Sequence, residues 1–395
     1  MELLIKNAKI IDHALSFKGD IYVKDGIIKE IGETLDKACD ILDAKGQILM
    51  PAFVDLHCHF RDPGLTYKED LETGSRAAVK GGFTTVNLMP NTKPIVSSME
   101  TVNYVLEKAA KIGLIDVHQT MSITKDLQGK DISHLNNINS MVKAVTDDGR
   151  GVNDNKVMYD AMTFAKDKGL IVMSHAEDEA TTPISQRLSE NLMTYRDTAL
   201  AKYTGARLHM CHVSTIEAMK DIIRAKEEGY SVTCEVTPHH IALTDEVKYR
   251  VNPPIRRKED VMFLIDAIKK GYVDAIGTDH APHSKEDKEK GACGMSGIET
   301  AFSICYSNLV KAGEISINKL SEIMSKNPAE IIGFNKGKIA IGYDADFVLV
   351  DLEGKEKIDV NNFESKGKNS PFDGMEFYGM VMKTIKAGKI VYERK

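Results

Sequence analysis

The stretch PAFVDLHCHFRDPG, residues 51–64, begins as an apolar run and ends in histidine, arginine and aspartate. The apolar part predicts a buried strand, and His57 and His59, two residues apart, project to the same side of an extended chain. Imidazole groups are typical ligands of Zn²⁺ and related ions. We therefore predict a metal site at the end of a strand. A polar loop that happens to be rich in histidine is the simpler alternative.

Similar apolar runs recur along the middle of the chain and alternate with helical patterns. The runs lie at residues 52–56, 84–88, 115–121, 141–145, 170–173, 207–210, 231–235 and 273–276. Amphipathic patterns at 70–82, 99–113, 156–169 and 214–229 lie between them, and several end at glycine. Eight such units predict an α/β protein built on a (β/α)8 TIM barrel over residues 51–337. A doubly wound open sheet is less favoured, because no glycine-rich phosphate loop follows the first strand.

The two ends of the chain differ from the middle. Residues 1–50 and 338–395 alternate apolar and polar residues in short runs separated by turns such as Lys-Asp-Gly and Ala-Lys-Gly. This pattern is typical of β-hairpins. We predict one small composite β domain assembled from both termini.

The bulk composition excludes several classes of protein. The chain has 395 residues, 42% hydrophobic and 28% charged, with a net charge of −6, which argues against a nucleic-acid partner or a polybasic membrane surface. No apolar run approaches the length of a membrane helix, and no signal-peptide pattern is evident, so a cytoplasmic location is expected. The six cysteines are scattered, which favours reduced thiols over a disulfide framework.

Ionisable side chains follow five of the eight predicted strands. They are His57 and His59, Asp147 and Asp148, His175, His209 and His212, and Asp279, His280 and His283. In a barrel the carboxyl ends of the strands meet at one rim, where active sites are built. Their coincidence predicts a shared metal centre. His209 is expected to face away from it, because His212 lies nearer the rim.

Eight motifs taken together resemble the type I dihydroorotases of the amidohydrolase superfamily. They are DLHCHFRDPG, GGFTTVNLMPNT, TDDG, SHAED, CHVST, EVTPHH, NPPIR and TDHAPH, in this order. The resemblance implies a barrel with one or two zinc ions, two being favoured. It implies that His57, His59 and Asp279 bind the more buried ion and that His175 and His212 bind the second.

The resemblance also implies a carboxylate that bridges the two metals, and three residues compete for this role. Asp148 is preferred, because an Asp-Asp-Gly sequence at this place is the type I pattern. Asp147 is the first alternative. Lys143 is the second, because many relatives use a carbamylated lysine as the bridge.

The implied reaction is the reversible cyclisation of N-carbamoyl-L-aspartate to L-dihydroorotate and water, in pyrimidine biosynthesis. Asp279 would be the catalytic acid and base. Arg61, Asn91 and His283 would hold the substrate carboxylate, for which a guanidinium is well suited. The remaining substrate contacts implied are His59, Asn252, Cys293 and Gly294.

Other readings of the same motifs remain open. An allantoinase or a hydantoinase would share the fold and the metals but act on other cyclic ureides. A catalytically silent scaffold for aspartate transcarbamoylase should have lost ligands, whereas all six are present here. A structural barrel would bind no metal. Both a homodimer and a complex with aspartate transcarbamoylase are compatible with an active enzyme.

Overall fold

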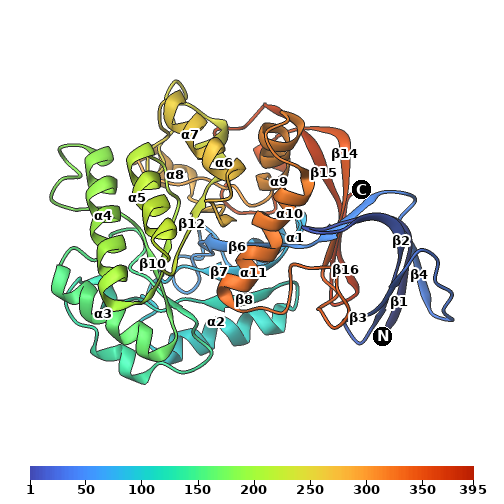
Figure 1. Ribbon diagram of the computed structural model, residues 1–395, viewed down its shortest axis with the longest axis horizontal. Coiled ribbons are helices and arrows are strands. Elements are labelled where there is room, and N and C mark those ends of the chain that lie inside the picture. Colours follow the sequence, from blue (N-terminus) through green and yellow to red (C-terminus); the bar gives the residue numbers. More distant parts are fainter.

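Eight parallel strands form a ring at the centre of the computed structural model, which describes residues 1–395 (Figure 1). The strands are β6 (Phe53–Cys58), β7 (Phe83–Leu88), β8 (Asp116–Gln119), β9 (Ala144–Val145), β10 (Ile171–Ser174), β11 (Arg207–Met210), β12 (Val232–Val236) and β13 (Ala275–Ile276). Every one of the predicted apolar runs overlaps one of them. The short β9 and β13 occupy only the ends of their runs.

The ring closes through two single bridges. Strands β6, β7 and β8 pair in parallel, and so do β9 to β13. A parallel bridge between Met121 and Val145 joins β8 to β9, and another between Cys58 and His280 joins β6 to the segment after β13. All carboxyl ends therefore meet at one rim, and the predicted (β/α)8 barrel is confirmed.

Helices surround the strands. The long ones are α1 (Leu71–Lys80), α2 (Met99–Ile112), α3 (Asn155–Lys168), α4 (Gln186–Thr204), α5 (Ile216–Glu227) and α7 (Lys258–Lys269). Short helices are α6 (Pro238–Ala242), α8 (Lys285–Glu289), α9 (Ala301–Cys305), α10 (Ile317–Ser321) and α11 (Asn327–Ile332). The 3₁₀ turns are η1 (Lys125–Leu127), η2 (Ser133–Asn137) and η5 (Val360–Asn362), and η1 and η2 replace a helix between β8 and β9. The π-helical segments are η3 (Tyr306–Lys311) and η4 (Glu322–Lys326). No helix has both the length and the apolar character needed to cross a bilayer.

The glycine stops in the sequence mark the helix ends. Helix α2 ends at Gly113 with φ of 73°, and α3 ends at Gly169 with φ of 68°. Glycine adopts this left-handed conformation without the steric cost of a Cβ atom. The backbone then turns directly into the next strand.

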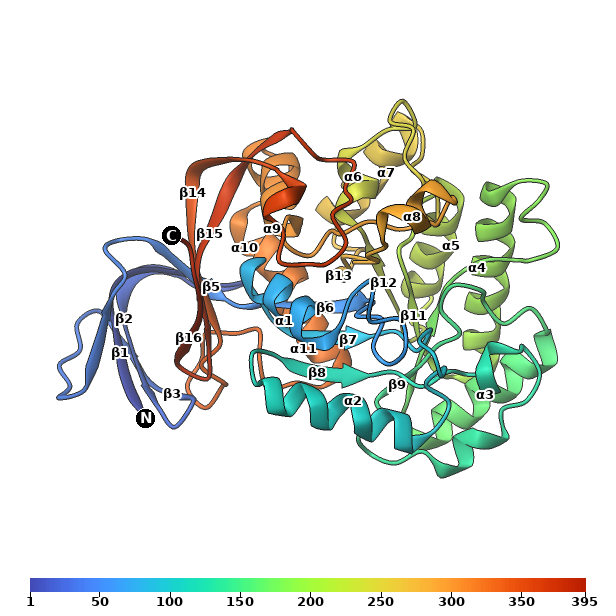
Figure 2. The ribbon, with the colours of Figure 1, turned by 180° about the vertical axis from the view of Figure 1, so that it is seen from behind.

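Strands from both termini share one sheet beside the barrel (Figure 2). They are β1 (Glu2–Ile11), β2 (Ser16–Lys24), β3 (Ile27–Gly32), β4 (Asp40–Asp43), β5 (Ile48–Pro51), β14 (Phe347–Lys357), β15 (Glu376–Lys386) and β16 (Lys389–Glu393). The termini meet where β5 pairs antiparallel with β14, with Leu49 opposite Leu349. The sheet has a core of its own, which includes Ile10, Ile21 and Phe347. Its separation from the barrel at residues 50/51 and 337/338 stays a prediction.

One predicted hairpin is wrong. The Lys-Asp-Gly turn does join paired antiparallel strands, and Asp25 and Gly26 have φ of 52° and 77°. The Ala-Lys-Gly turn at residues 44–46, in contrast, joins β4 to β5, which both pair in parallel with β1. A turn with suitable residues reverses the chain into a hairpin only where the two strands pair with each other.

Candidate metal centre and active site

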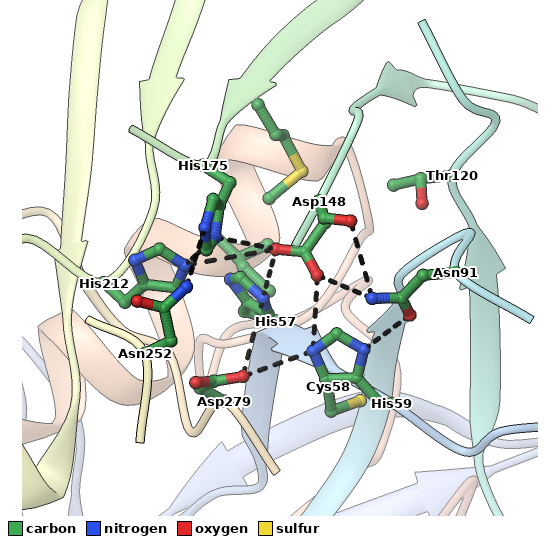
Figure 3. A network of polar contacts seen from close by, with 12 residues as sticks. His57, Cys58, His59, Asn91, Thr120, Asp148, His175, His212, Asn252 and Asp279 are labelled. Carbon is green, nitrogen blue, oxygen red and sulfur yellow. Dashed lines mark hydrogen bonds and ion pairs between the residues drawn. The ribbon is translucent and has the colours of Figure 1, made fainter. Parts of the chain in front are cut away.

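The six predicted metal ligands come together at the carboxyl rim of the barrel (Figure 3). They lie at or just after the ends of five strands, namely β6, β9, β10, β11 and β13. All are buried: the relative exposures are 0% for His57, 5% for His59, 4% for Asp148, 5% for His175, 3% for His212 and 6% for Asp279. Residues separated by more than 200 positions thus form one cluster.

Asp148 lies between the histidines. Its Oδ1 atom is 3.2 Å from His57 Nε2, 3.5 Å from His175 Nδ1 and 3.9 Å from His212 Nε2. Its Oδ2 atom is 3.5 Å from His59 Nε2, which lies 3.2 Å from Asp279 Oδ1. The Asp148 carboxylate is therefore shared by the two histidine groups that the sequence assigned to separate ions.

The side chains fit a divalent metal ion. His57, His59 and Asp279 form one group of close donor atoms, and His57, Asp148 and His212 form another. His57 Nε2 is buried without a hydrogen-bond partner, although it points at two carboxylates. Burial disfavours ionisation of Asp148, but the neighbouring His57 and His175 hold the pKa of its carboxyl well below its ordinary value. Ionised carboxylates beside an unpartnered imidazole nitrogen are the donors that a zinc site requires.

The alternative bridging residues have other environments. Asp147 accepts hydrogen bonds from the backbone N–H of Thr124, at 2.9 Å, and from the Thr124 hydroxyl. Lys143 is exposed and directly precedes β9, at the end of the barrel away from the histidines. Of the three candidates, Asp148 is the one that contacts the histidines.

Three site residues have a strained backbone. The φ angles are 57° for Arg61, 35° for His212 and 45° for Asp279. Non-glycine residues adopt positive φ at a cost of about 1–2 kcal/mol, and such residues cluster at functional sites. These unusual backbone conformations direct the three side chains toward the same part of the rim.

An open cavity of about 280 Å³ lies over the cluster. All seven predicted substrate contacts line it: His59, Arg61, Asn91, Asn252, His283, Cys293 and Gly294. Five of the six metal-ligand candidates line it as well, and His57 lies beneath them. The predicted substrate and metal residues therefore face the same space.

Arg61 is buried at this cavity, with 8% exposure, and makes no ion pair. Its Nε donates to the carbonyl of Pro282 at 3.4 Å, and its Nη2 lies 3.4 Å from His283 Nε2. Burial and the nearby Arg61 and Lys68 cations lower the pKa of His283 to about 3, so this imidazole is neutral. Arg61 is therefore not part of a surface salt bridge.

Asn91 and Asn252 are already bonded to the metal-site residues. Asn91 accepts from His59 Nδ1 at 2.8 Å and donates to Asp148 Oδ2 at 3.0 Å. Asn252 Nδ2 lies 3.3 Å from His175 Nε2. Both amides line the cavity while they orient the cluster.

The loop of Cys293 and Gly294 closes one side of the cavity. The Cys293 carbonyl accepts from His283 Nε2 at 2.8 Å, and the Gly294 carbonyl accepts from Lys288 Nζ at 2.7 Å. Gly294 has φ of 129°, and a Cβ atom there would lie 2.6 Å from the carbonyl oxygen of Ala281. Only glycine fits at this position.

Comparisons with known proteins identify the family of this chain. A model of the amidohydrolase family matches residues 48–391. The chain belongs to the amidohydrolase family. It is 56% identical to a dihydroorotase from Clostridium botulinum (strain Eklund 17B / Type B), over 100% of both chains. It is 40% identical to a dihydroorotase from Ruminiclostridium cellulolyticum, over 100% of this chain and 99% of the relative.

Among solved structures, this amidohydrolase resembles the L-hydantoinase (dihydropyrimidinase) from Arthrobacter aurescens. The TM-score is 0.89 at 27% identity, covering 99% of this chain and 96% of the other. The resemblance inferred from the sequence motifs is confirmed, and the chain is a metal-dependent cyclic amide hydrolase by family. The hydantoinase likeness shows that the same barrel also serves other cyclic ureides.

Two glutamates of this amidohydrolase contact the metal-ligand histidines but were not predicted from the sequence. Glu235 on β12 is fully buried and contacts His57 Nδ1 at 2.8 Å. Glu177 contacts His175 Nε2 at 2.9 Å and accepts from Asn252 Nδ2 at 2.9 Å. Both lie within the motifs EVTPHH and SHAED, of which only the histidines were considered as candidate site residues. A lone glutamate in the apolar run VTCEV was the available signal.

His209 contacts the same glutamate. Its Nε2 lies 3.2 Å from Glu235 Oε2 and its Nδ1 lies 2.9 Å from Thr233 Oγ1. It is fully buried below the cluster. His209 therefore contacts Glu235 and Thr233 and none of the six metal-ligand candidates.

Proposed function

We propose that this amidohydrolase is a dihydroorotase, which interconverts N-carbamoyl-L-aspartate and L-dihydroorotate with water in pyrimidine biosynthesis. The full-length similarity to proteins named dihydroorotase supports the proposal. The observation that carries it is Arg61, a buried guanidinium without an ion pair beside the metal-ligand cluster. A buried charge needs a partner, and the substrate carboxylate supplies one.

The neutral ureide rings of hydantoin and allantoin carry no such carboxylate. For them Arg61 would stay buried and unpaired, which is costly. His283, which contacts Arg61, and Asn91 both line the cavity and would complete the carboxylate site. Asn252, Cys293 and Gly294 would face the amide edge of the ring.

We propose zinc as the metal, with two ions per chain. His57, His59 and Asp279 would hold one ion, His175 and His212 the other, and Asp148 would contact both. The metal would polarise the ring amide carbonyl and increase the acidity of the attacking water. His59 and Arg61, two residues apart, would align the substrate between the metal and the carboxylate site.

Asp279 would move the proton. Its carboxyl is buried, yet its hydrogen bond to His59 and the nearby His57 keep its pKa below the ordinary value, so it begins as a base. In hydrolysis it takes one proton from water, whose oxygen bonds to the amide carbon, and delivers that proton to the nitrogen as the C–N bond breaks. In cyclisation it removes the ureido proton that the departing water carries away.

The test combines metal analysis with turnover assays. We expect stoichiometric zinc and hydrolysis of L-dihydroorotate, with hydantoin and allantoin far slower. Metal-free active protein, or preference for either neutral ureide, would contradict the proposal. A homodimer, a complex with aspartate transcarbamoylase and a cytoplasmic location stay predictions.

Arg61→Met should raise the KM for dihydroorotate and lower kcat/KM about 100-fold, since two charge-assisted hydrogen bonds contribute about 3 kcal/mol. Arg61→Lys keeps the charge but loses the planar fork, and we expect an intermediate loss. Steady-state kinetics at constant zinc content measures both. An unchanged KM in Arg61→Met would show that the carboxylate binds elsewhere.

A further inference from the structure

Glu235 lies directly beneath the metal-ligand cluster. It is fully buried, and its Oε1 atom lies 2.8 Å from His57 Nδ1, on the opposite side of the ring from Asp148. The backbone N–H of His212 donates to the same oxygen at 3.4 Å, and Oε2 lies 3.2 Å from His209 Nε2. One carboxylate thus contacts two of the strands that carry ligand candidates.

The barrel keeps space for this carboxylate. Gly277 follows β13, and a Cβ atom at that position would lie 2.4 Å from the carboxyl carbon of Glu235. Any larger residue would displace Glu235 from the barrel interior. A buried carboxylate destabilises the fold unless its oxygens accept hydrogen bonds. Glu235 has three such donors, His57 Nδ1, the His212 backbone N–H and His209 Nε2.

The contact decides which nitrogen of His57 carries the proton. A carboxylate accepts hydrogen bonds, so the contact with Glu235 keeps a proton on Nδ1 and leaves Nε2 as the nitrogen that can give its lone pair to a metal ion. Nε2 is the atom that faces Asp148 and Asp279 without a hydrogen-bond partner. With the proton on Nε2 instead, His57 would bond to Asp148 and offer no lone pair to a metal ion.

We propose that Glu235 is a positioning residue, which holds His57 in the Nδ1–H tautomer and so presents Nε2 to the metal. His57 belongs to all three groups of close donor atoms, one of which includes Cys211 and Glu235, so its tautomer affects the whole cluster. The proposal deepens the proposed function and rests on its metal dependence. Carboxylates behind metal-bound histidines act in this way in other proteins, and their loss typically costs 10- to 100-fold in metal affinity.

Two substitutions of Glu235 by residues of similar size distinguish its role as a hydrogen-bond acceptor for His57 from simple packing in the barrel interior. Glu235→Gln keeps an oxygen that accepts from His57 Nδ1–H, and the His212 N–H favours that orientation of the amide. The Gln amide N–H can then donate to His209 Nε2, while His209 Nδ1–H donates to Thr233. Glu235→Met fills the same space but accepts nothing from His57.

The first readout is zinc affinity, measured by competition with a chromophoric chelator. We expect a 10- to 100-fold loss in Glu235→Met and a loss of no more than a few-fold in Glu235→Gln. Glu299→Met, which removes a buried carboxylate that pairs with Lys80 and contacts none of the metal-ligand candidates, is the matched control and should keep zinc affinity. Equal losses in the Met and Gln variants, or wild-type affinity in Glu235→Met, would overturn the proposal.

The second readout needs no metal and no activity. Imidazole ¹⁵N shifts of the metal-free protein report the tautomer of His57, whose signals are assigned by their absence in His57→Gln. We expect the Nδ1–H signature in the wild type and in Glu235→Gln, and its loss in Glu235→Met. An Nδ1 atom without a proton in the wild type would overturn the proposal. If the wild type binds no zinc, the proposed function fails while this readout still decides the role of Glu235.

Discussion

At the scale of single residues, the groups that surround a buried side chain determine what it can bind. Arg61 and His57 were both predicted from the sequence as site residues, but the groups that surround them were not. The sequence shows that an arginine follows a strand, whereas its lack of an ion pair depends on which carboxylates fold against it. Likewise the Asp-Asp-Gly motif alone favoured Asp148, whereas the structure shows that Thr124, on a different segment, bonds to Asp147.

His118 on β8 makes stability depend on pH. Burial, together with the nearby Lys143, lowers the pKa of His118 to about 3, whereas the unfolded chain has a value near 6.5. The unfolded state therefore binds a proton first as pH falls, and stability present above pH 6.5 is lost progressively down to about pH 3. Between pH 7.5 and 5.5 this amounts to about 1.4 kcal/mol.

His118→Gln should reduce that pH dependence. The variant keeps an acceptor for the Lys143 backbone N–H, which donates to His118 Nε2 at 2.8 Å. Urea denaturation of both proteins at pH 7.5 and 5.5 gives the two free-energy differences, and we expect that of the variant to be smaller by about 1.4 kcal/mol. The same difference in both proteins would show that His118 is not the group that titrates.

At the scale of secondary structure, strand order was predictable and strand pairing was not. Apolar runs and glycine stops located all eight barrel strands, because burial on both faces requires continuous apolar residues. The hairpin predicted at residues 44–46 is wrong, because β4 and β5 pair with β1 rather than with each other. Pairing depends on distant partners, which a local turn does not specify.

Helix α3 offers a test of a local signal. Asp154 caps its amino terminus and accepts from the N–H groups of Lys156 and Val157 at 2.8 and 3.0 Å. Asp154→Ala should lower the free energy of unfolding by about 1 kcal/mol, because two helix N–H groups lose their acceptor. Denaturation measures the loss, and turnover should not change. Asp154→Ser restores a cap, so an equal loss in both variants would mean that the cap does not contribute.

At the scale of the whole molecule, Lys336 joins the barrel to the terminal sheet. Its side chain is 4% exposed and contacts Asp116 at the start of β8 and Asp346 next to β14, the latter at 2.5 Å. The surrounding carboxylates hold its pKa above the ordinary value despite burial. A buried lysine between two aspartates fixes how the two parts pack.

Lys336→Met should destabilise the protein by about 3 kcal/mol, because it leaves the buried Asp346 without its cation. The melting temperature and urea midpoint measure the loss. Lys338→Met, which breaks the more exposed pair with Glu330, is the matched control and should cost about 0.5 kcal/mol or less. Similar losses in both variants would show that the Lys336 pair does not join the two parts.

The sequence by itself determined the barrel and its rim, because strand periodicity and the residues at strand ends are local properties, and the resemblance to type I dihydroorotases selected the six metal-ligand candidates. The sequence also placed strands at both termini, and the structure pairs them in one sheet. Only the tertiary structure decided that Arg61 is unpaired, that Asp148 rather than Asp147 or Lys143 contacts the histidines, and that Glu235 lies behind His57. These are contacts between residues far apart in the chain, and hydrogen bonds and ion pairs act only over a few ångströms once the barrel has closed.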